Sequence, residues 1–221
     1  MSASVADTAL RLKVAEIFYS LQGESDSVGW PTVFVRLTGC PLRCSYCDTA
    51  YAFSGGEWLS VEAVMERVRG LALRHVCVTG GEPLAQKACL SLLRRLCDEG
   101  FLVSLETSGA LALQGVDPRV VKVVDVKTPD SGESGRNLLP QLQELDSRDQ
   151  VKFVVCSRAD YEWSRELVAA HSLAARCSVL FSPAAGSLSA PDLADWILAD
   201  RLPVRMQVQL HKILWGNSPG K

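Results

Sequence analysis

The sequence predicts a partial, open α/β barrel, in which about six parallel strands form a sheet and helices cover its outer side. Apolar, β-branched runs alternate along the 221 residues with stretches of helical period, which is typical of βα units. Near-continuous apolar runs also indicate parallel strands that are buried on both faces. About six such runs are fewer than the roughly eight strands of a closed α/β barrel, so we expect the sheet to stay open.

The elements follow in a regular order. Strands are predicted at 33–37, 75–80, 101–107, 120–127, 151–155 and 178–183. Helical periodicity predicts helices between them at 60–73, 84–100, 161–175 and 190–200. Residues 128–137, rich in Gly, Ser and charge, indicate a loop before a short helix near 138–145, and a last strand is predicted at 206–212. No repeat or linker divides the sequence, so we expect residues 1–221 to form a single domain.

Composition restricts the class of protein. With 48% hydrophobic and 22% charged residues, the chain can bury a sizeable core. A net charge of −2 without a long basic run argues against a nucleic-acid-binding surface. No apolar run approaches the roughly 18 residues of a membrane span, and residues 1–14 lack the pattern of a secretory signal. We therefore expect a cytoplasmic protein with a small-molecule partner and no membrane contact.

The most specific motif is a group of three cysteines, Cys40, Cys44 and Cys47, in the run TGCPLRCSYCDTAY that follows a predicted strand. This spacing supplies three thiolates to one metal centre and leaves a further position open, as a catalytic site needs. Reduced cysteines are expected in the cytosol, which favours metal binding over disulfides. The next possible ligands, His75 and Cys77, belong to a strand, but a zinc site stays an alternative.

The remaining cysteines and histidines have weaker patterns. His171 lies on a predicted helix and is interpreted as a packing residue. For His211, in the last predicted strand, the residues alone favour a structural role, although that strand could end beside the site. The other cysteines lie in or beside apolar patterns, where Cys usually acts as a small buried hydrophobe, and we assign no chemistry to Cys77, Cys89, Cys97, Cys156 and Cys177.

Small and charged residues follow the ends of the predicted strands. The carboxyl ends of parallel strands meet at one rim, where ligands bind. Paired glycines permit close approach to a ligand, and Glu82 can accept an ammonium group. Each motif alone is equally consistent with an ordinary βα turn. The strand-end groups are Thr79 to Pro83, Glu106 to Gly109, Asp125 with Lys127, and Ser182 with Pro183.

Together these motifs resemble the radical S-adenosylmethionine (SAM) superfamily, in which a cysteine triplet follows the first strand and GGE the second. Within it, the chain is similar over essentially its whole length to the 7-carboxy-7-deazaguanine synthase family of queuosine and 7-deazapurine biosynthesis. The combination of LQGE, CDT and the terminal QLHK is specific, whereas the cysteines alone indicate only the superfamily. The similar segments are EIFYSLQGES, FVRLTGCPLRCSYCDTAYAF, VTGGEP, LETSG, DVKTP, VKFVV and QLHK.

The resemblance implies a carbon–nitrogen lyase. Its reaction would be the radical ring contraction of 6-carboxy-5,6,7,8-tetrahydropterin to 7-carboxy-7-deazaguanine with loss of ammonia. It implies a [4Fe-4S] cluster on the three cysteines, S-adenosyl-L-methionine as a second cofactor, and Mg²⁺ on Thr49 with Asp48 as a helper. A flavodoxin-like electron donor and a homodimer are also implied.

The resemblance also implies which residues bind the two organic ligands. Arg36 suits the substrate carboxylate because a guanidinium can bind it bidentately. The implied substrate contacts are Leu21, Gln22, Gly23, Glu24, Arg36, Thr79 and His211. The implied SAM contacts are Gly81, Glu82, Glu106, Ser108, Asp125, Val126, Lys127, Ser182, Pro183, Ala184 and Ala185.

Two other functions stay open at this point. A glycyl-radical activase shares the cluster and GGE but acts on a protein, and LQGE and QLHK argue against it. A zinc-binding interaction module without catalysis is the alternative from another class.

Overall fold

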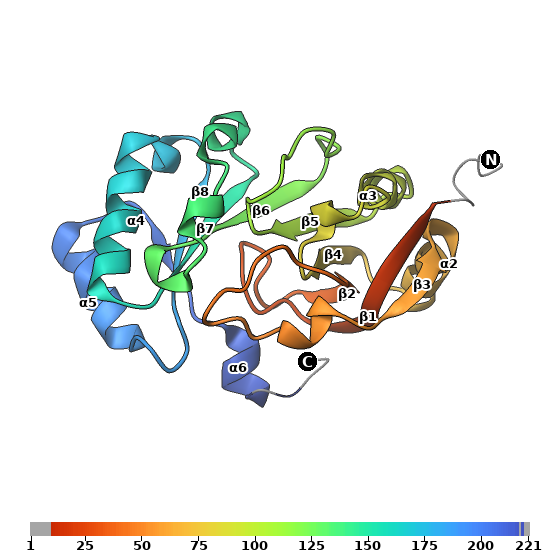
Figure 1. Cartoon of the computed structure of the whole chain (residues 1–221), viewed down its shortest axis with the longest axis horizontal. Helices are drawn as coiled ribbons and strands as arrows, with labels where there is room; N and C mark the ends of the chain where they lie inside the picture. Colours follow the sequence, from red (N-terminus) through yellow and green to blue (C-terminus); the bar gives the residue numbers. More distant parts are fainter. Residues whose placement is uncertain (1–9, 217, 219–221) are drawn as a thin grey trace.

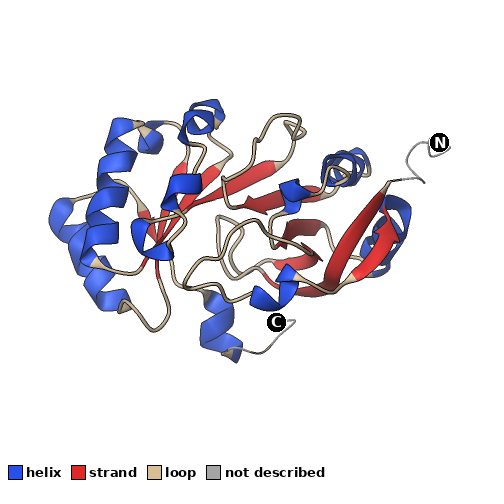
Figure 2. Ribbon diagram, viewed as in Figure 1, coloured by secondary structure: helices blue, strands red, loops and turns tan. Residues whose placement is uncertain are grey.

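One sheet with nine strands organises the protein, in the order β3-β1-β2-β4-β5-β6-β7-β8-β9. The computed structural model describes residues 10–216 and 218, and Figures 1 and 2 show the helices around the sheet. The strands are β1 (Arg11–Leu21), β2 (Pro31–Leu37), β3 (Glu57–Ser60), β4 (His75–Gly80), β5 (Leu102–Thr107), β6 (Val121–Val126), β7 (Gln150–Val155), β8 (Ser178–Pro183) and β9 (Arg205–Met206). The helices are α2 (Val61–Gly70), α3 (Cys89–Asp98), α4 (Arg158–Ala170), α5 (Ala190–Asp200) and α6 (Leu210–Trp215).

The predicted open α/β architecture is confirmed. Strands β2 and β4 to β8 pair in parallel, and β3 and β9 lie at opposite ends of the strand order, so the sheet does not close into a barrel. Two strands were not predicted: β1 and β3 add an antiparallel edge beside β2. The segment 128–137 contains two short 3-10 turns, and 139–144 is a 3-10 helix.

The prediction of a strand at 206–212 is wrong. Only Arg205 and Met206 pair with β8, and the chain then leaves the sheet. Gln207 still donates its backbone N–H to Phe181, but the N–H of Leu210 donates to the carbonyl of Gly23, in the β1–β2 loop. The chain therefore turns into the short helix α6, and His211 lies in this helix rather than on a strand.

The parallel strands have two chemically different faces. Val33, Val35 and Leu37 of β2 are fully buried in a core cluster, whereas Phe34 and Arg36, at the alternate positions, line a pocket. Since side chains alternate along a strand, the same division recurs along the sheet. The pocket side receives Thr79 from β4, Glu106 from β5, Asp125 from β6 and Lys152 from β7. These strands are therefore apolar on the outer face and polar on the inner one.

Two apolar clusters hold the helices against the outer face. The first joins α2 and α3 to β1, β2, β4 and β5, and Leu92 of α3 is completely buried in it. The second joins α4 and α5 to β6, β7 and β8; Phe181 meets Phe153 and Tyr161 edge-on with ring centroids 5.3 and 5.9 Å apart. Figure 1 shows these two helix pairs at opposite ends of the sheet. The cores fix the strands and so place the residues of the inner face.

Serine side chains begin three of the helices. Ser60, Ser157 and Ser189 each accept a hydrogen bond from a backbone N–H in the first turn of α2, α4 and α5, at 3.1 to 3.2 Å. Such caps satisfy donors that the helix itself leaves unpaired. Among the described residues, none of the helices combines the length and apolar character that crossing a membrane would require.

The outer core predicts a clear difference between two leucines on helices. Leu92→Ala removes a fully buried side chain and should lower the free energy of unfolding by about 2–5 kcal/mol. Leu198→Ala in α5, where the side chain is 74% exposed, should change it by less than about 0.5 kcal/mol. Urea unfolding of both variants checks this, and equal losses would contradict the assignment of the core.

Candidate active site

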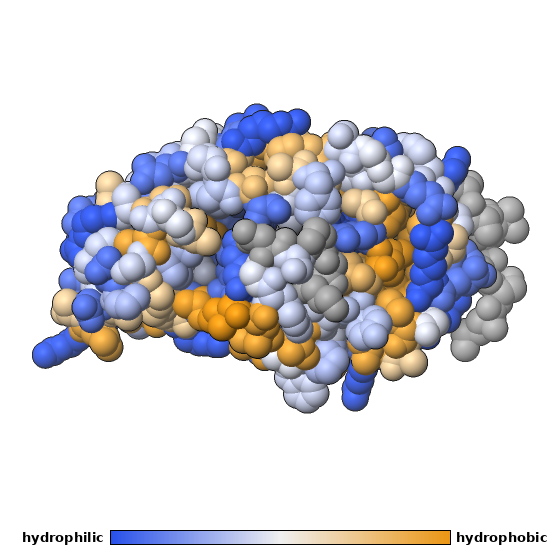
Figure 3. All heavy atoms as spheres, turned by 90° about the horizontal axis from the view of Figure 1, so that it is seen from below, coloured by the Kyte–Doolittle hydropathy of each residue, from blue (hydrophilic) through white to orange (hydrophobic). Residues whose placement is uncertain are grey.

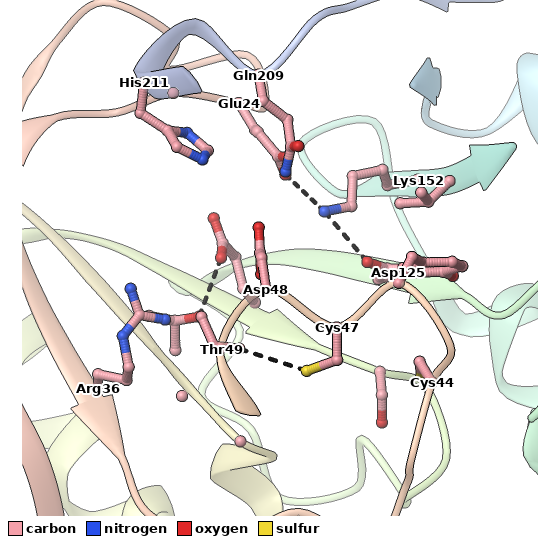
Figure 4. A pocket seen from close by; sticks show the side chains of 18 of the residues that line it. Glu24, Arg36, Cys44, Cys47, Asp48, Thr49, Asp125, Lys152, Gln209 and His211 are labelled. Atoms are coloured by element: carbon pink, nitrogen blue, oxygen red, sulfur yellow. Dashed lines mark hydrogen bonds and ion pairs between the residues drawn. The ribbon is translucent and has the colours of Figure 1, made fainter. Parts of the chain in front are cut away.

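A pocket of about 610 Å³ lies along the inner face of the sheet. At one end is the β1–β2 loop, which begins after Leu21 beside the start of β2; at the other is the cysteine loop, which follows β2. Figure 4 shows side chains from these loops, the strands and α6 pointing toward one another. The pocket thus brings together motifs that are far apart in the sequence.

The three motif cysteines all line this pocket as free, partly buried thiols. In the part of the chain that the structure describes, no three Cys, His, Asp or Glu side chains are close enough to form a single-ion site. A four-iron cluster does not require that, because each thiolate binds a different iron. Burial raises the pKa of both Cys40 and Cys44, and Lys127 opposes this increase at Cys44. Three soft donors around one cavity, with a nearby cation that favours thiolate, fit an iron–sulfur cluster.

Hydrogen bonds hold the cysteine loop to the segment after β6. The backbone N–H of Arg43 donates to the carboxylate of Glu133 at 2.6 Å, and that of Ser45 donates to the carbonyl of Ser131 at 3.0 Å. The guanidinium of Arg43 donates to the carbonyl of Cys40 at 2.8 Å. The 128–137 segment therefore supports the loop that bears the thiols.

The paired glycines allow the strand end to approach the cysteine loop closely. A Cβ on Gly80 would lie 2.2 Å from the carbonyl oxygen of Leu37, and one on Gly81 would lie 2.2 Å from that of Gly39. The backbone N–H of Gly81 donates to Leu37 and that of Glu82 to Gly39, at 2.9 and 2.7 Å. Close packing of these two backbones is therefore one reason for the glycines.

Glu82 lies behind the pocket wall. Its side chain is completely buried and is not among the lining residues. Its carboxylate accepts hydrogen bonds from the hydroxyl of Thr107, from both the hydroxyl and the N–H of Ser108, and from the N–H of Leu84. Glu82 thus joins the end of β4 to the end of β5, and Ser108, which it holds, does line the pocket.

A chain of opposite charges crosses the inner face. The Lys152 ammonium lies 2.5 Å from Glu24 Oε2 and 3.1 Å from Asp125 Oδ2, and the Lys127 ammonium lies 3.0 Å from Asp125 Oδ1. Burial alone would raise the pKa of Asp125, but Lys127 and Lys152 outweigh it and hold the pKa below its usual value. Burial opposes ionisation of Lys152, yet Asp125 and Glu24 raise its pKa well above the ordinary lysine value. Asp125 and Lys152 therefore favour each other's charged form.

Two further polar groups occupy the side of the pocket formed by β1, β2 and β5. Glu106 accepts hydrogen bonds from Gln22 at 3.2 Å and from the Thr79 hydroxyl at 3.0 Å. Arg36 donates to Glu16 at 2.7 Å, and its guanidinium lies 5.8 Å from the centroid of the Phe18 ring. The strand register places a cation on β2 and an acceptor on β5, with Thr79 of β4 between them, all facing one cavity.

The C-terminal segment covers the open side of the sheet. Ser25 donates its N–H to Gln207 Oε1 at 2.9 Å, and Lys212 Nζ lies 3.2 Å from Asp48 Oδ2 in the cysteine loop. A Cβ on Gly23 would lie 2.2 Å from Nδ1 of His211, so these two residues are packed in direct contact. Residues 207–212 thus connect the two loops at opposite ends of the pocket.

Most of the expected site residues meet in this one pocket. All seven expected substrate contacts line it, as do the three cysteines, Thr49 and Asp48. Of the expected SAM contacts, Gly81, Glu106, Ser108, Asp125, Lys127, Ala184 and Ala185 line it, whereas Glu82, Val126, Ser182 and Pro183 do not. Val126 packs in the core, and the Ser182 hydroxyl donates to the carbonyl of Gln207.

Several lining residues were missed by the sequence reasoning. Lys152 is the clearest case, because a single lysine in the otherwise apolar run VKFVV is a signal from which a charge on the inner face could have been predicted. Gln209 and Lys212 were missed because their segment was taken for a strand. Nothing in the local pattern singled out Phe18 and Phe34, whose rings stack 5.1 Å apart on the cavity wall.

Comparisons with known proteins agree with this geometry. Residues 34–126 match the model of the radical SAM superfamily. The chain is 46% identical to the 7-carboxy-7-deazaguanine synthase of Chlorobaculum tepidum, over 94% of this chain and 96% of the relative. It is 43% identical to that of Koribacter versatilis, over 92% and 97% of the two chains.

A solved structure shows the same fold. The crystal structure of QueE from Escherichia coli superposes with a TM-score of 0.78 at 25% identity, covering 95% of this chain and 99% of that one. Sequence similarity over nearly the full length of the curated relatives thus agrees with the fold. The chain belongs to the radical SAM superfamily and, within it, to the 7-carboxy-7-deazaguanine synthase family.

Proposed function

We propose that this chain converts 6-carboxy-5,6,7,8-tetrahydropterin to 7-carboxy-7-deazaguanine, with loss of ammonia, as a carbon–nitrogen lyase. The observation that supports this most strongly is the meeting of the cysteine triplet, the LQGE segment and the QLHK segment in one pocket. The family name of its relatives supplies the product. A polar cavity with both cations and acceptors suits a bicyclic substrate that has one carboxylate and many N–H groups.

At the end of the pocket formed by the cysteine loop, Cys40, Cys44 and Cys47 would hold a [4Fe-4S] cluster. A cluster held there, together with S-adenosyl-L-methionine and an electron from a donor, would supply the radical chemistry for hydrogen abstraction from the substrate. The wall residues proposed to contact the SAM molecule are Gly81, Glu106, Ser108, Asp125, Lys127, Ala184 and Ala185. Glu82, Val126, Ser182 and Pro183 would support this wall from behind.

Lys127 and the neighbouring Tyr46 ring together suit a ligand that stacks on an aromatic ring and accepts hydrogen bonds. Its ammonium is fixed by Asp125 and lies 5.6 Å from the centroid of the Tyr46 ring, which belongs to the cysteine loop. The ring and the ammonium therefore present an aromatic face and a donor to the same side of the cavity. We assign this corner to the nucleoside part of the SAM molecule.

The opposite end would bind the pterin. Leu21, Gln22, Gly23 and Glu24 supply backbone and side-chain hydrogen-bonding groups, with Thr79 and His211 beside them. Arg36 would bind the substrate carboxylate, because its guanidinium has donors beyond the one that Glu16 engages. The Thr49 hydroxyl, with Asp48 nearby, would bind Mg²⁺, which prefers oxygen ligands. The metal would orient the carboxylate and stabilise charge as ammonia leaves.

Finer properties are proposed on narrower grounds. All eight cysteines are free thiols, which supports a reducing, cytoplasmic location. Residues 1–221 are proposed to act as one domain, since one sheet runs through both apolar clusters.

A homodimer and a flavodoxin-like electron donor are proposed from the family. Val208, Ile213 and Leu214 are exposed at and before α6, and Figure 3 shows apolar surface in this region, where a second chain could bind.

An anaerobic assay tests the reaction. Iron-reconstituted protein is incubated with S-adenosyl-L-methionine, Mg²⁺, a strong reductant and 6-carboxytetrahydropterin, and products are identified by mass. Formation of 7-carboxy-7-deazaguanine supports the proposal. Release of 5′-deoxyadenosine and methionine alone would refute the substrate, and a colourless protein that binds zinc instead of iron would refute the enzyme.

Two cysteine variants separate the cluster ligands from the packing cysteines. Cys44→Ala removes a pocket thiol and should abolish both product formation and the brown iron–sulfur absorbance after reconstitution. Cys97→Ala changes a partly buried cysteine that packs against the first core cluster, outside the pocket, and should keep both. Iron analysis and visible absorbance of the two proteins provide the measurement. Normal iron content in Cys44→Ala would show that this thiol is not a ligand.

The contact between Gly23 and His211 gives a steric test. A methyl group at Gly23 would meet His211 Nδ1 at 2.2 Å, so Gly23→Ala should displace the QLHK segment and raise the KM for the pterin about tenfold or more. Gly135→Ala is the matched control, because a Cβ there has nothing within 4 Å. Steady-state kinetics of both variants are compared with the wild type. An unchanged KM in Gly23→Ala would mean that the close contact is not needed for substrate binding.

A further inference from the structure

Lys152 is a buried lysine that the proposed function leaves without a role. It projects from the middle of β7 into the pocket, and only 8% of its surface is exposed. Its ammonium lies between two carboxylates, one from the β1–β2 loop and one from β6, as Figure 4 shows. A buried cation in such a position needs both partners, because an unpaired one is strongly disfavoured.

The contact with Lys152 fixes the orientation of the Glu24 carboxylate. Glu24 is 7% exposed, and its Oε2 accepts the hydrogen bond from Lys152 at 2.5 Å. Within residues 10–216 and 218, its other oxygen, Oε1, is buried and has no hydrogen-bond partner. A buried acceptor without a partner is costly unless a ligand supplies the donor. Lys152 therefore holds Glu24 with one oxygen engaged and the other without a partner among the described residues.

We propose that Lys152 is a positioning residue for substrate recognition, which fixes Glu24 so that its free oxygen accepts an N–H group of the pterin. The proposal rests on the function proposed above. The aminopyrimidine edge of a pterin has adjacent N–H donors, and an oriented carboxylate is a strong acceptor for them. Lys152 acts through Glu24 and does not itself need to touch the substrate.

The second contact connects the two ends of the site. Asp125, which Lys152 also holds, is paired with Lys127 at the proposed SAM corner. Because Asp125 keeps Lys127 as a partner when Lys152 is removed, the SAM corner should be affected less than Glu24, which has no other cation within 4 Å among the described residues. Loss of Lys152 should therefore weaken pterin binding selectively.

A partly buried lysine outside the pocket provides a matched control. Lys122 on β6 pairs with the buried Asp149 at 2.8 Å, and neither residue lines the pocket. Lys122→Met removes a lysine from an ion pair with a buried carboxylate without reaching the site. It measures what the loss of such a lysine does to folding alone.

The experiment compares the KM for the pterin and the KM for S-adenosyl-L-methionine in five variants: Lys152→Met, Lys152→Arg, Lys122→Met, Glu24→Gln and the Glu24→Gln/Lys152→Met double variant. Lys152→Met should raise the KM for 6-carboxytetrahydropterin about tenfold or more while the KM for S-adenosyl-L-methionine changes less than about threefold. Lys152→Arg should recover part of this loss, because it keeps a cation between the carboxylates. If Lys152 acts through Glu24, the double variant should be no worse than Glu24→Gln alone.

The possible results are distinct. If the wild type forms no 7-carboxy-7-deazaguanine, the proposed function fails, and this proposal with it. If the wild type is active but Lys152→Met keeps its KM for the pterin, or raises both KM values as Lys122→Met does, only the positioning role is overturned. If Lys152→Met does not fold, Lys152→Arg and the double variant decide: a wild-type KM for the pterin in Lys152→Arg supports the role, and a double variant with a higher KM than Glu24→Gln alone would overturn it.

Discussion

Charge compensation on the inner face of the sheet is the constraint on which the site depends. The helix-covered face of each parallel strand is apolar, but the alternate positions hold Arg36, Glu106, Asp125 and Lys152 in a largely buried cavity. Ionised groups persist in such surroundings only when an opposite charge or hydrogen-bond donors accompany them. The strand register provides these partners. The pairing that stabilises the buried charges on the inner face therefore also leaves defined acceptors and donors facing a ligand.

The cysteine loop depends on a second kind of complementarity, between backbones rather than charges. The paired glycines at the end of β4 let two chain segments touch where any side chain would collide with a carbonyl oxygen, and Glu82 fixes the same turn to the end of β5. Hydrogen bonds from Arg43 and Ser45 secure the other side of the loop. Three thiols on a surface loop are thereby held at one end of the cavity without being buried in the core.

Much of the fold and site could be predicted, because the informative patterns are local. Six parallel strands follow from apolar runs, and the cysteine triplet, LQGE and QLHK are contiguous motifs. The antiparallel strand β1, which lies between β3 and β2, is not predicted because EIFYSLQGES is informative mainly as a motif. The strand assigned to 206–212 failed because its end is decided by a distant partner, the carbonyl of Gly23. Glu82 stays a predicted SAM contact, and the folded chain adds what no local pattern indicates, that its oxygens accept hydrogen bonds from Thr107 and Ser108.

Because residues 207–212 cover the pocket, the order of folding decides when the pocket is closed. The hydrogen bond between Ser25 and Gln207 closes a loop of 182 residues, and contacts of such long sequence separation form slowly because much chain entropy is lost first. Residues 207–212 also leave the ribosome after all the strands of the sheet, which can begin to fold before them. We expect a folding intermediate that already has its strands and cysteine loop but lacks its cover. In that interval the three thiols are most accessible, both to an iron donor and to oxidation.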